Sequence, residues 1–216
     1  IETMFQKTGK QAVILIDEYD SPLQHSWKTP YHEACTAIYR EVFAILKADD
    51  KYEKFVFITG ITKFTQISLF SVLNNLSNIS FDSEYAALCG ITKEEVVRNF
   101  KPEINKLAEY EDWTFDEAVA QLTAYYDGYH FSRRNMVDIF NPFSLLSSLS
   151  LKRVEPFWFS TGTPTYLINM MRKYEFLPAD LGEAIEVGKK DFDAPTETMT
   201  TIVPLLYQSG YVTIKG

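Results

Sequence analysis

The sequence predicts an α/β fold in which part of a parallel sheet is followed by a helical region and a winged-helix-like C-terminal part. Two apolar, β-rich runs at residues 11–16 and 55–59 are separated by a stretch with helical spacing. Threonine–glutamate pairs then mark the starts of helices. Near the end, the periodic residues of 197–208 give way to an alternating segment, which is the order expected of a winged helix.

The first strand, residues 11–16 (QAVILI), is a continuous apolar run, which is typical of a parallel strand buried on both faces. Residues 31–47 have the apolar spacing of a helix, and residues 55–59 (FVFIT) repeat the strand pattern. Two strands joined by a helix form a βαβ unit, which places both carboxyl ends at one edge of the sheet. Ligands of α/β proteins bind at that edge.

Two capping boxes predict where the next helices begin. Thr92 with Glu95, and Thr114 with Glu117, have the spacing in which the threonine oxygen accepts a backbone N–H and the glutamate reaches back. The helices are expected near residues 93–109 and 115–126.

Shorter elements complete the chain. Residues 79–81 are expected as a third strand, and a turn and hairpin precede a helix that opens at Pro142. A further helix is expected near Pro164, and residues 211–215 alternate as a strand would. The predicted regions are 1–90 for the rear part of the sheet domain, 91–150 for a helical lid and 151–216 for the winged-helix-like part.

Composition narrows the class of protein. The 216 residues carry a net charge of -8, which argues against a broad surface for nucleic acid or anionic membrane. No apolar run is long enough to span a bilayer. Two cysteines lack the spacing of a metal site and are too few for a disulfide framework, which favours a reducing compartment. We expect a soluble, cytoplasmic protein.

The acids at the end of the first strand are the strongest sign of chemistry. Four apolar residues followed by Asp17 and Glu18 form a Walker B pattern. Asp17 would hold Mg²⁺, directly or through a water, and Glu18 would orient or deprotonate the attacking water. The alternative is that acids end many strands because loops are polar.

Thr59 ends the second strand, where P-loop ATPases place a polar sensor of the γ-phosphate, or else it merely caps a strand. Lys63 would neutralise phosphate or be a solvated loop lysine. No G-x-x-x-x-G-K-[ST] loop occurs, so these residues alone should bind ATP poorly. Both ends of the sequence are expected to be cut from a longer protein.

The order of motifs resembles the predicted AAA-ATPase-like proteins common in bacteria, which are related to the STAND class. The matching blocks, in chain order, are VILIDEYDSPL, FVFITGITKFTQISLFSVLNNL, YAALCGITKEEV, YYDGYHF, NPFSLL, STGTPTYL and LLYQSGYVTIKG. Together they cover nearly the whole chain. The resemblance implies an upstream Walker A segment and often a downstream nuclease-like domain.

Residue by residue, the resemblance implies that Asp17 and Glu18 are the Walker B acids and Thr59 the first sensor, while the adjacent Tyr19-Asp20 extends Walker B without a firm role. It also implies a lid element around Tyr129, His130 and Pro142 that contacts the base and sugar. The alternative is that Tyr126, Tyr129 and Phe131 are core aromatic residues of a hairpin.

The leading hypothesis is an ATP- and Mg²⁺-dependent switch that hydrolyses its nucleotide slowly. A second hypothesis keeps the fold as a non-hydrolysing scaffold, and a third makes the acids a metal-dependent nuclease site. The third is disfavoured because neither apolar strand ends in E-x-K. Oligomeric state stays open.

Overall fold

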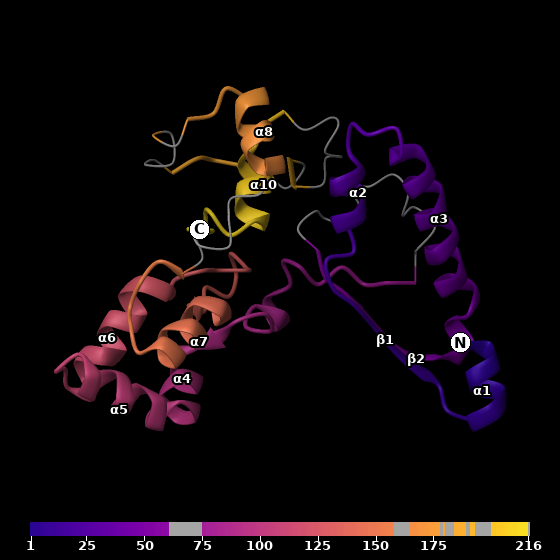
Figure 1. The fold of residues 1–216 in the computed structure, drawn as a ribbon. Helices are drawn as coiled ribbons and strands as arrows, with labels where there is room; N and C mark the ends of the chain where they lie inside the picture. The colour runs from indigo at the N-terminus through magenta and orange to yellow at the C-terminus, as the bar shows by residue number, and fades with distance from the viewer. Residues whose placement is uncertain are drawn as a thin grey trace. The chain divides into compact units, whose positions relative to one another are not determined.

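A computed structural model of the chain describes residues 1–60, 75–157, 165–177, 179, 184–188, 191–192 and 200–215. The architecture is α/β with a small parallel sheet (Figure 1). The chain divides into two compact units. Unit 1 comprises Ile1–Asn78 and Ile185–Ser209, and unit 2 comprises Ile79–Ala184 and Gly210–Gly216.

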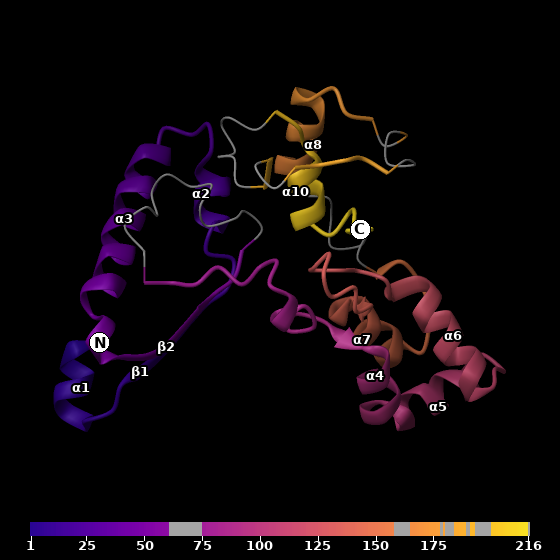
Figure 2. The same ribbon diagram turned by 180° about the vertical axis from the view of Figure 1, so that it is seen from behind.

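Unit 1 holds the predicted parallel strand pair. The two strands run side by side in the same direction, with Val13 opposite Phe55 and Ile16 opposite Ile58 (Figures 1 and 2). The βαβ prediction is confirmed, because α3 connects them. The elements of this unit are α1 (Glu2–Thr8), β1 (Ala12–Ile16), α2 (Ser21–Ser26), α3 (His32–Ala48), the 3-10 helix η1 (Asp50–Tyr52), β2 (Glu53–Ile58) and α10 (Val203–Gln208).

The two faces of this sheet differ in burial. Ile14 and Ile16 pack against the core of unit 1, whereas Val13 and Leu15 on the opposite face are 57% and 70% exposed. The continuous apolar run predicted that both faces of the sheet are buried. The described residues cover one of these two faces. The buried core residues of this cluster are Tyr19, Leu23, Phe43 and Leu46.

Unit 2 is mainly helical, and its small antiparallel sheet pairs Ile91 with Phe140 and Thr92 with Ile139. Its elements are the 3-10 helix η4 (Ser83–Tyr85), β3 (Ile91–Thr92), α4 (Lys93–Asn99), α5 (Lys101–Tyr110), α6 (Phe115–Tyr126), β4 (Ile139–Phe140), α7 (Pro142–Leu151) and α8 (Thr165–Lys173).

Both predicted capping boxes are confirmed. At α4 the Thr92 hydroxyl accepts from the Glu95 N–H, and the Glu95 carboxylate accepts from the Thr92 N–H at 2.9 Å. At α6 the carboxylate of Glu117 accepts from the Thr114 N–H at 2.7 Å. Each box satisfies backbone donors that a helix start leaves without a partner.

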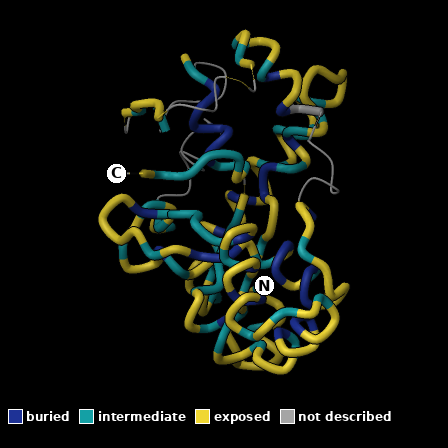
Figure 3. The backbone as a smooth tube through the Cα atoms, turned by 90° about the vertical axis from the view of Figure 1, so that its left-hand side faces the viewer, coloured by how far each residue is buried: buried dark blue, intermediate teal, exposed yellow. Residues whose placement is uncertain are grey.

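The core of unit 2 forms where α4 to α7 meet β4. Exposed positions interrupt the buried ones along each helix, as amphipathic helices require (Figure 3). Tyr126 ties the end of α6 to the loop after α7, because its hydroxyl donates to Glu155 O at 2.8 Å and accepts from Glu155 N at 2.9 Å. The buried core residues are Val96, Ile104, Leu107, Ala108, Ala118, Val119, Leu122, Tyr126, Phe140, Leu145, Leu149 and Phe157.

Three predicted elements differ from the structure. The helix expected near residues 93–109 is divided at Phe100, because Pro102 has no N–H to continue the hydrogen-bond ladder of α4. Residues 79–81 and 211–215 are not strands. The terminal segment is fixed instead by contacts with His130.

Among the described residues, no helix has both the length and the apolar character required to cross a membrane.

Candidate functional site

The candidate site lies at the carboxyl ends of β1 and β2. Since Ile16 and Ile58 are paired in the parallel register, the residues that follow them, Asp17 and Thr59, are also neighbours. The main chain continues the ladder past the strands: Thr59 N donates to Ile16 O at 2.8 Å, and Tyr19 N donates to Thr59 O at 3.0 Å. The strand ends are therefore held in one fixed arrangement.

The carboxylate of Asp17 is oriented by two donors. The hydroxyl of Thr59 and the backbone N–H of Glu18, at 3.0 Å, both donate to Asp17 Oδ1. The Asp17 residue is nevertheless exposed to solvent. An exposed, oriented carboxylate at the edge of a parallel sheet is a suitable oxygen ligand for Mg²⁺.

The described residues contain no group of three or more histidine, cysteine, aspartate or glutamate side chains arranged to hold a metal. A Mg²⁺ ion at Asp17 would therefore complete its coordination with water and with oxygens of a bound phosphate. Such a mixed ligand set is usual for Mg²⁺, which binds proteins through one or two carboxylates.

Glu18 has a left-handed backbone, with φ of 50°, and is exposed. This conformation is uncommon for a residue with a Cβ and costs about 1 kcal/mol. The carbonyl of Glu18 accepts from Ser21 N at 2.9 Å, which turns the chain from β1 into α2. The turn leaves the Glu18 carboxylate beside Asp17 in sequence and in contact with solvent.

Asp20, whose role the sequence leaves open, is only 2% exposed. Gln24 Nε2 donates to Asp20 Oδ2 at 2.8 Å. Gly60, which follows Thr59, lies against it: a Cβ on Gly60 would come 2.6 Å from Asp20 Oδ1 and would overlap the ring of Tyr19. A glycine directly after the second strand was the available sequence signal for this close approach.

Asp17, Glu18 and Thr59 are thus brought together, as the βαβ prediction required. Lys63 lies outside the described residues.

The remaining predicted residues belong to unit 2, and each has a structural contact there. Tyr129 forms a β-bridge with Ile139, and its ring meets Phe131 edge to face at 4.9 Å. Pro142 occupies the first turn of α7, which suits a residue without an N–H.

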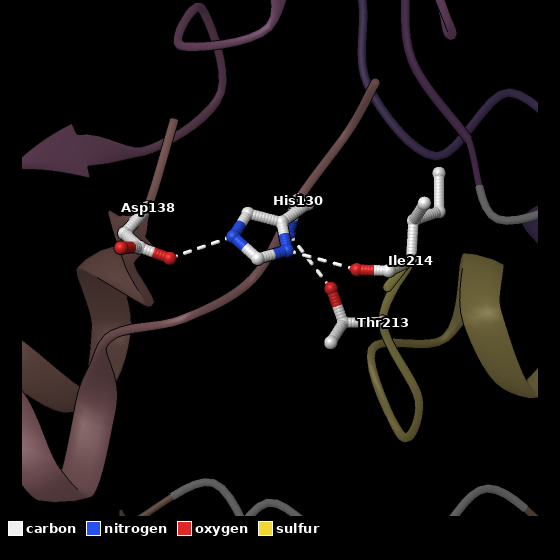
Figure 4. Close-up of polar contacts among 4 residues, drawn as sticks. All are labelled: His130, Asp138, Thr213 and Ile214. Carbon is white, nitrogen blue, oxygen red and sulfur yellow. Dashed lines mark hydrogen bonds and ion pairs between the residues drawn. The ribbon is translucent and has the colours of Figure 1, made fainter. Parts of the chain in front are cut away.

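His130 is more extensively engaged, as Figure 4 shows. Its Nε2 lies 2.6 Å from Asp138 Oδ1, its Nδ1 lies 2.8 Å from Ile214 O, and its backbone N–H donates to Thr213 Oγ1 at 2.7 Å. The role of Tyr129, His130 and Pro142 at a nucleotide stays a prediction.

Near this group, burial raises the pKa of Asp127, and the charge of Asp138 adds to that effect. The Oδ1 atom of Asp127 is buried and has no hydrogen-bond partner among the described residues. Burial therefore makes the neutral form of the Asp127 carboxyl group more favourable than it would be in water.

Comparisons with known proteins support the resemblance for the first part of the chain. Residues 1–70 match the family described as "Predicted AAA-ATPase". The chain is 35% identical over 218 residues to an "Uncharacterized protein in vnfD 5'region" of Azotobacter chroococcum mcd 1, and the alignment covers 95% of this chain. The chain spans 37% of the length of that relative. No solved structure matches.

The matching segment contains β1, β2 and the cluster of Asp17, Glu18 and Thr59. Over residues 1–70, the chain is therefore similar to the predicted AAA-ATPase family.

Proposed function

We propose that unit 1 carries the metal and water half of an ATP site and that the protein acts as an ATP-hydrolysing, nucleotide-dependent switch. The observation that carries this proposal is the hydrogen bond from the Thr59 hydroxyl to Asp17 Oδ1 at the ends of two adjacent parallel strands. The match of residues 1–70 to the AAA-ATPase-like family supports nucleotide as the ligand.

Each of the three side chains has a separate role in this proposal. Asp17 holds Mg²⁺, which when bound neutralises charge on the β- and γ-phosphates. Glu18 orients the attacking water and accepts its proton. The Thr59 hydroxyl fixes the Asp17 carboxylate. Because Thr59 also follows directly after β2, it transmits a change at the metal ion to that strand.

A segment upstream of β1 is proposed to supply the phosphate-binding loop, because the chain contains no such motif. The exposed apolar side chains Val13, Leu15 and Phe55 support this addition, since parallel sheets are normally covered on both faces. A downstream nuclease-like domain, which rests on the family resemblance alone, and a homo-oligomer are further parts of the proposal.

The test is ATP turnover by the protein with its native flanking segments, compared between wild type and Glu18→Gln. The expected loss is at least about a hundredfold in kcat, because the variant lacks the base but keeps the shape of the side chain. Glu41→Gln, an exposed glutamate on α3, is the matched control and should retain wild-type turnover.

The same experiment separates the other two hypotheses. Tight Mg²⁺-dependent ATP binding with no turnover by the wild type would favour a non-hydrolysing scaffold. Mg²⁺-dependent cutting of DNA that is lost in Asp17→Asn would favour a nuclease. Turnover that is unchanged in Glu18→Gln would contradict the assignment of the base.

A further inference from the structure

Asp20 is an acid whose place in the fold a helix cap does not explain. It stands at the N-terminal end of α2, where an aspartate commonly accepts a hydrogen bond from a backbone N–H of the helix. The Asp20 side chain makes no such cap, and the residue is only 2% exposed. Its carboxylate is directed into unit 1 instead of toward the first turn of its own helix.

The buried carboxylate connects α2 with the end of β2. Gln24 Nε2, one turn along α2, donates to Asp20 Oδ2 at 2.8 Å. The other oxygen, Oδ1, lies so close to Gly60 that a Cβ there would come within 2.6 Å of it. Burying a carboxylate is costly, and an apolar side chain would fill the same space at lower cost. An acid at this position therefore indicates a role beyond packing.

The residue that the Asp20 contact adjoins is the strained one of the candidate site. Glu18 has φ of 50°, and its own N–H donates to Asp17 Oδ1 at 3.0 Å. On its other side, Tyr19 N donates to Thr59 O at 3.0 Å, and the Tyr19 ring lies in the core of unit 1. A strained backbone persists only where its surroundings determine it, and such strain is concentrated at active sites. The buried pair of Tyr19 and Asp20 supplies those surroundings.

We propose that Asp20 is a positioning residue. Its buried carboxylate anchors the turn after β1 against Gly60, and this anchor keeps Glu18 in the left-handed conformation that directs the Glu18 carboxylate to the attacking water. The inference rests on the proposed function, because that function assigns Glu18 as the base. Asp20 acts through Glu18 and is not itself a catalytic residue.

The anchor can be tested without nucleotide. Asp20→Asn keeps the size of the side chain and replaces one carboxylate oxygen with an amide donor. Amide exchange of Tyr19, whose N–H donates to Thr59 O, should become about fivefold faster in this variant, whereas exchange within β1 and β2 should match the wild type. Unchanged exchange of Tyr19, or equally faster exchange throughout both strands, would overturn the proposed anchor.

ATP turnover tests whether the anchor serves Glu18. In the protein with its native flanking segments, Asp20→Asn should lower kcat by about tenfold and leave KM for ATP within about threefold, since positioning of a base affects the chemical step. In the Glu18→Gln background, the same change should lower the residual turnover by less than about twofold, because the base is already absent. Asp116→Asn, at an exposed aspartate on α6, is the matched control and should retain wild-type turnover.

Gln24→Met removes the donor to Asp20 and leaves the acid in place, so it is the second variant for the same test if Asp20→Asn does not fold. Its kcat should fall by about threefold, again only where Glu18 is present. Losses of the same factor in both backgrounds, or no loss in either, would overturn the inference and leave the proposed function intact. Wild-type turnover by Glu18→Gln alone is a distinguishable result, because it would contradict the proposed function and the inference together.

Discussion

Gly60 lies directly against the buried carboxylate of Asp20, so that a Cβ added to Gly60 would come 2.6 Å from Asp20 Oδ1. The same atom would overlap the ring of Tyr19, which is 4% exposed and forms part of the core of unit 1. The end of β2 and the start of α2 are therefore packed with no room for a side chain. This contact positions the loop that carries Asp17 and Glu18.

Replacing Gly60 with alanine should destabilise unit 1 by about 1–3 kcal/mol, because Tyr19 and Asp20 must both move to admit a methyl group. Amide exchange in β1 and β2 measures this loss. Gly9→Ala is the comparison, since its Cβ meets nothing within 4 Å and its φ of 66° adds only a backbone cost of about 1 kcal/mol. Equal effects in the two variants would refute the close-packing explanation.

The sequence identified the parts of this site that depend on local pattern. Two apolar strands with a helix between them determine a parallel pair, and that pair places Asp17 beside Thr59. The threonines and glutamates of the capping boxes likewise act within one helical turn. Such features are visible in sequence because the interacting residues are close together along the chain.

The features that were missed depend on contacts between distant residues. The contact between Asp20 and Gly60 forms only when β2 pairs with β1, so the residues around Asp20 do not predict it, and the glycine after β2 was the available signal. Residues 211–215 alternate as a strand does, yet they form no strand, and Thr213 and Ile214 contact His130. Alternation shows that a segment suits a sheet, but a strand also needs a partner edge.

The cap of α6 should make unit 2 sensitive to acid. Hydrogen bonds from the backbone and then the hydroxyl of Thr114 lower the pKa of Glu117. The stability that this carboxylate contributes is therefore fully present above its ordinary pKa of about 4.3 and is lost as the pH falls through the lower folded value. Amide exchange in the first turn of α6 should accelerate over that range.

Glu117→Gln should reduce this acid response while the glutamine still accepts from the Thr114 N–H. Glu109→Gln, which makes the same charge change on α5, is the matched control. An acid response of α6 that is equal in Glu117→Gln and wild type would show that other carboxylates are responsible.

Leu122 lies at the centre of unit 2 and is 0% exposed. Leu122→Ala should lower the free energy of unfolding by about 2–5 kcal/mol, because it leaves a cavity that packed helices cannot fully close. Leu146→Ala, at a residue 46% exposed on α7, should cost far less. Urea unfolding reported by Trp113, with Trp27 and Trp158 replaced by phenylalanine, measures both. A similar loss in the two variants would contradict the position of the core.

Thr59 offers the sharpest test of the candidate site, because valine matches its shape without the hydroxyl that donates to Asp17. In the protein with its native flanking segments, Thr59→Val should lower ATP turnover by about tenfold or more, as loss of a hydrogen bond to a charged group predicts. Thr59→Ser keeps the donor and should stay within about threefold of wild type. Amide exchange in β1 and β2 should be alike in both variants, which separates chemistry from folding. Equal turnover in the two would show that the hydroxyl only ends a strand.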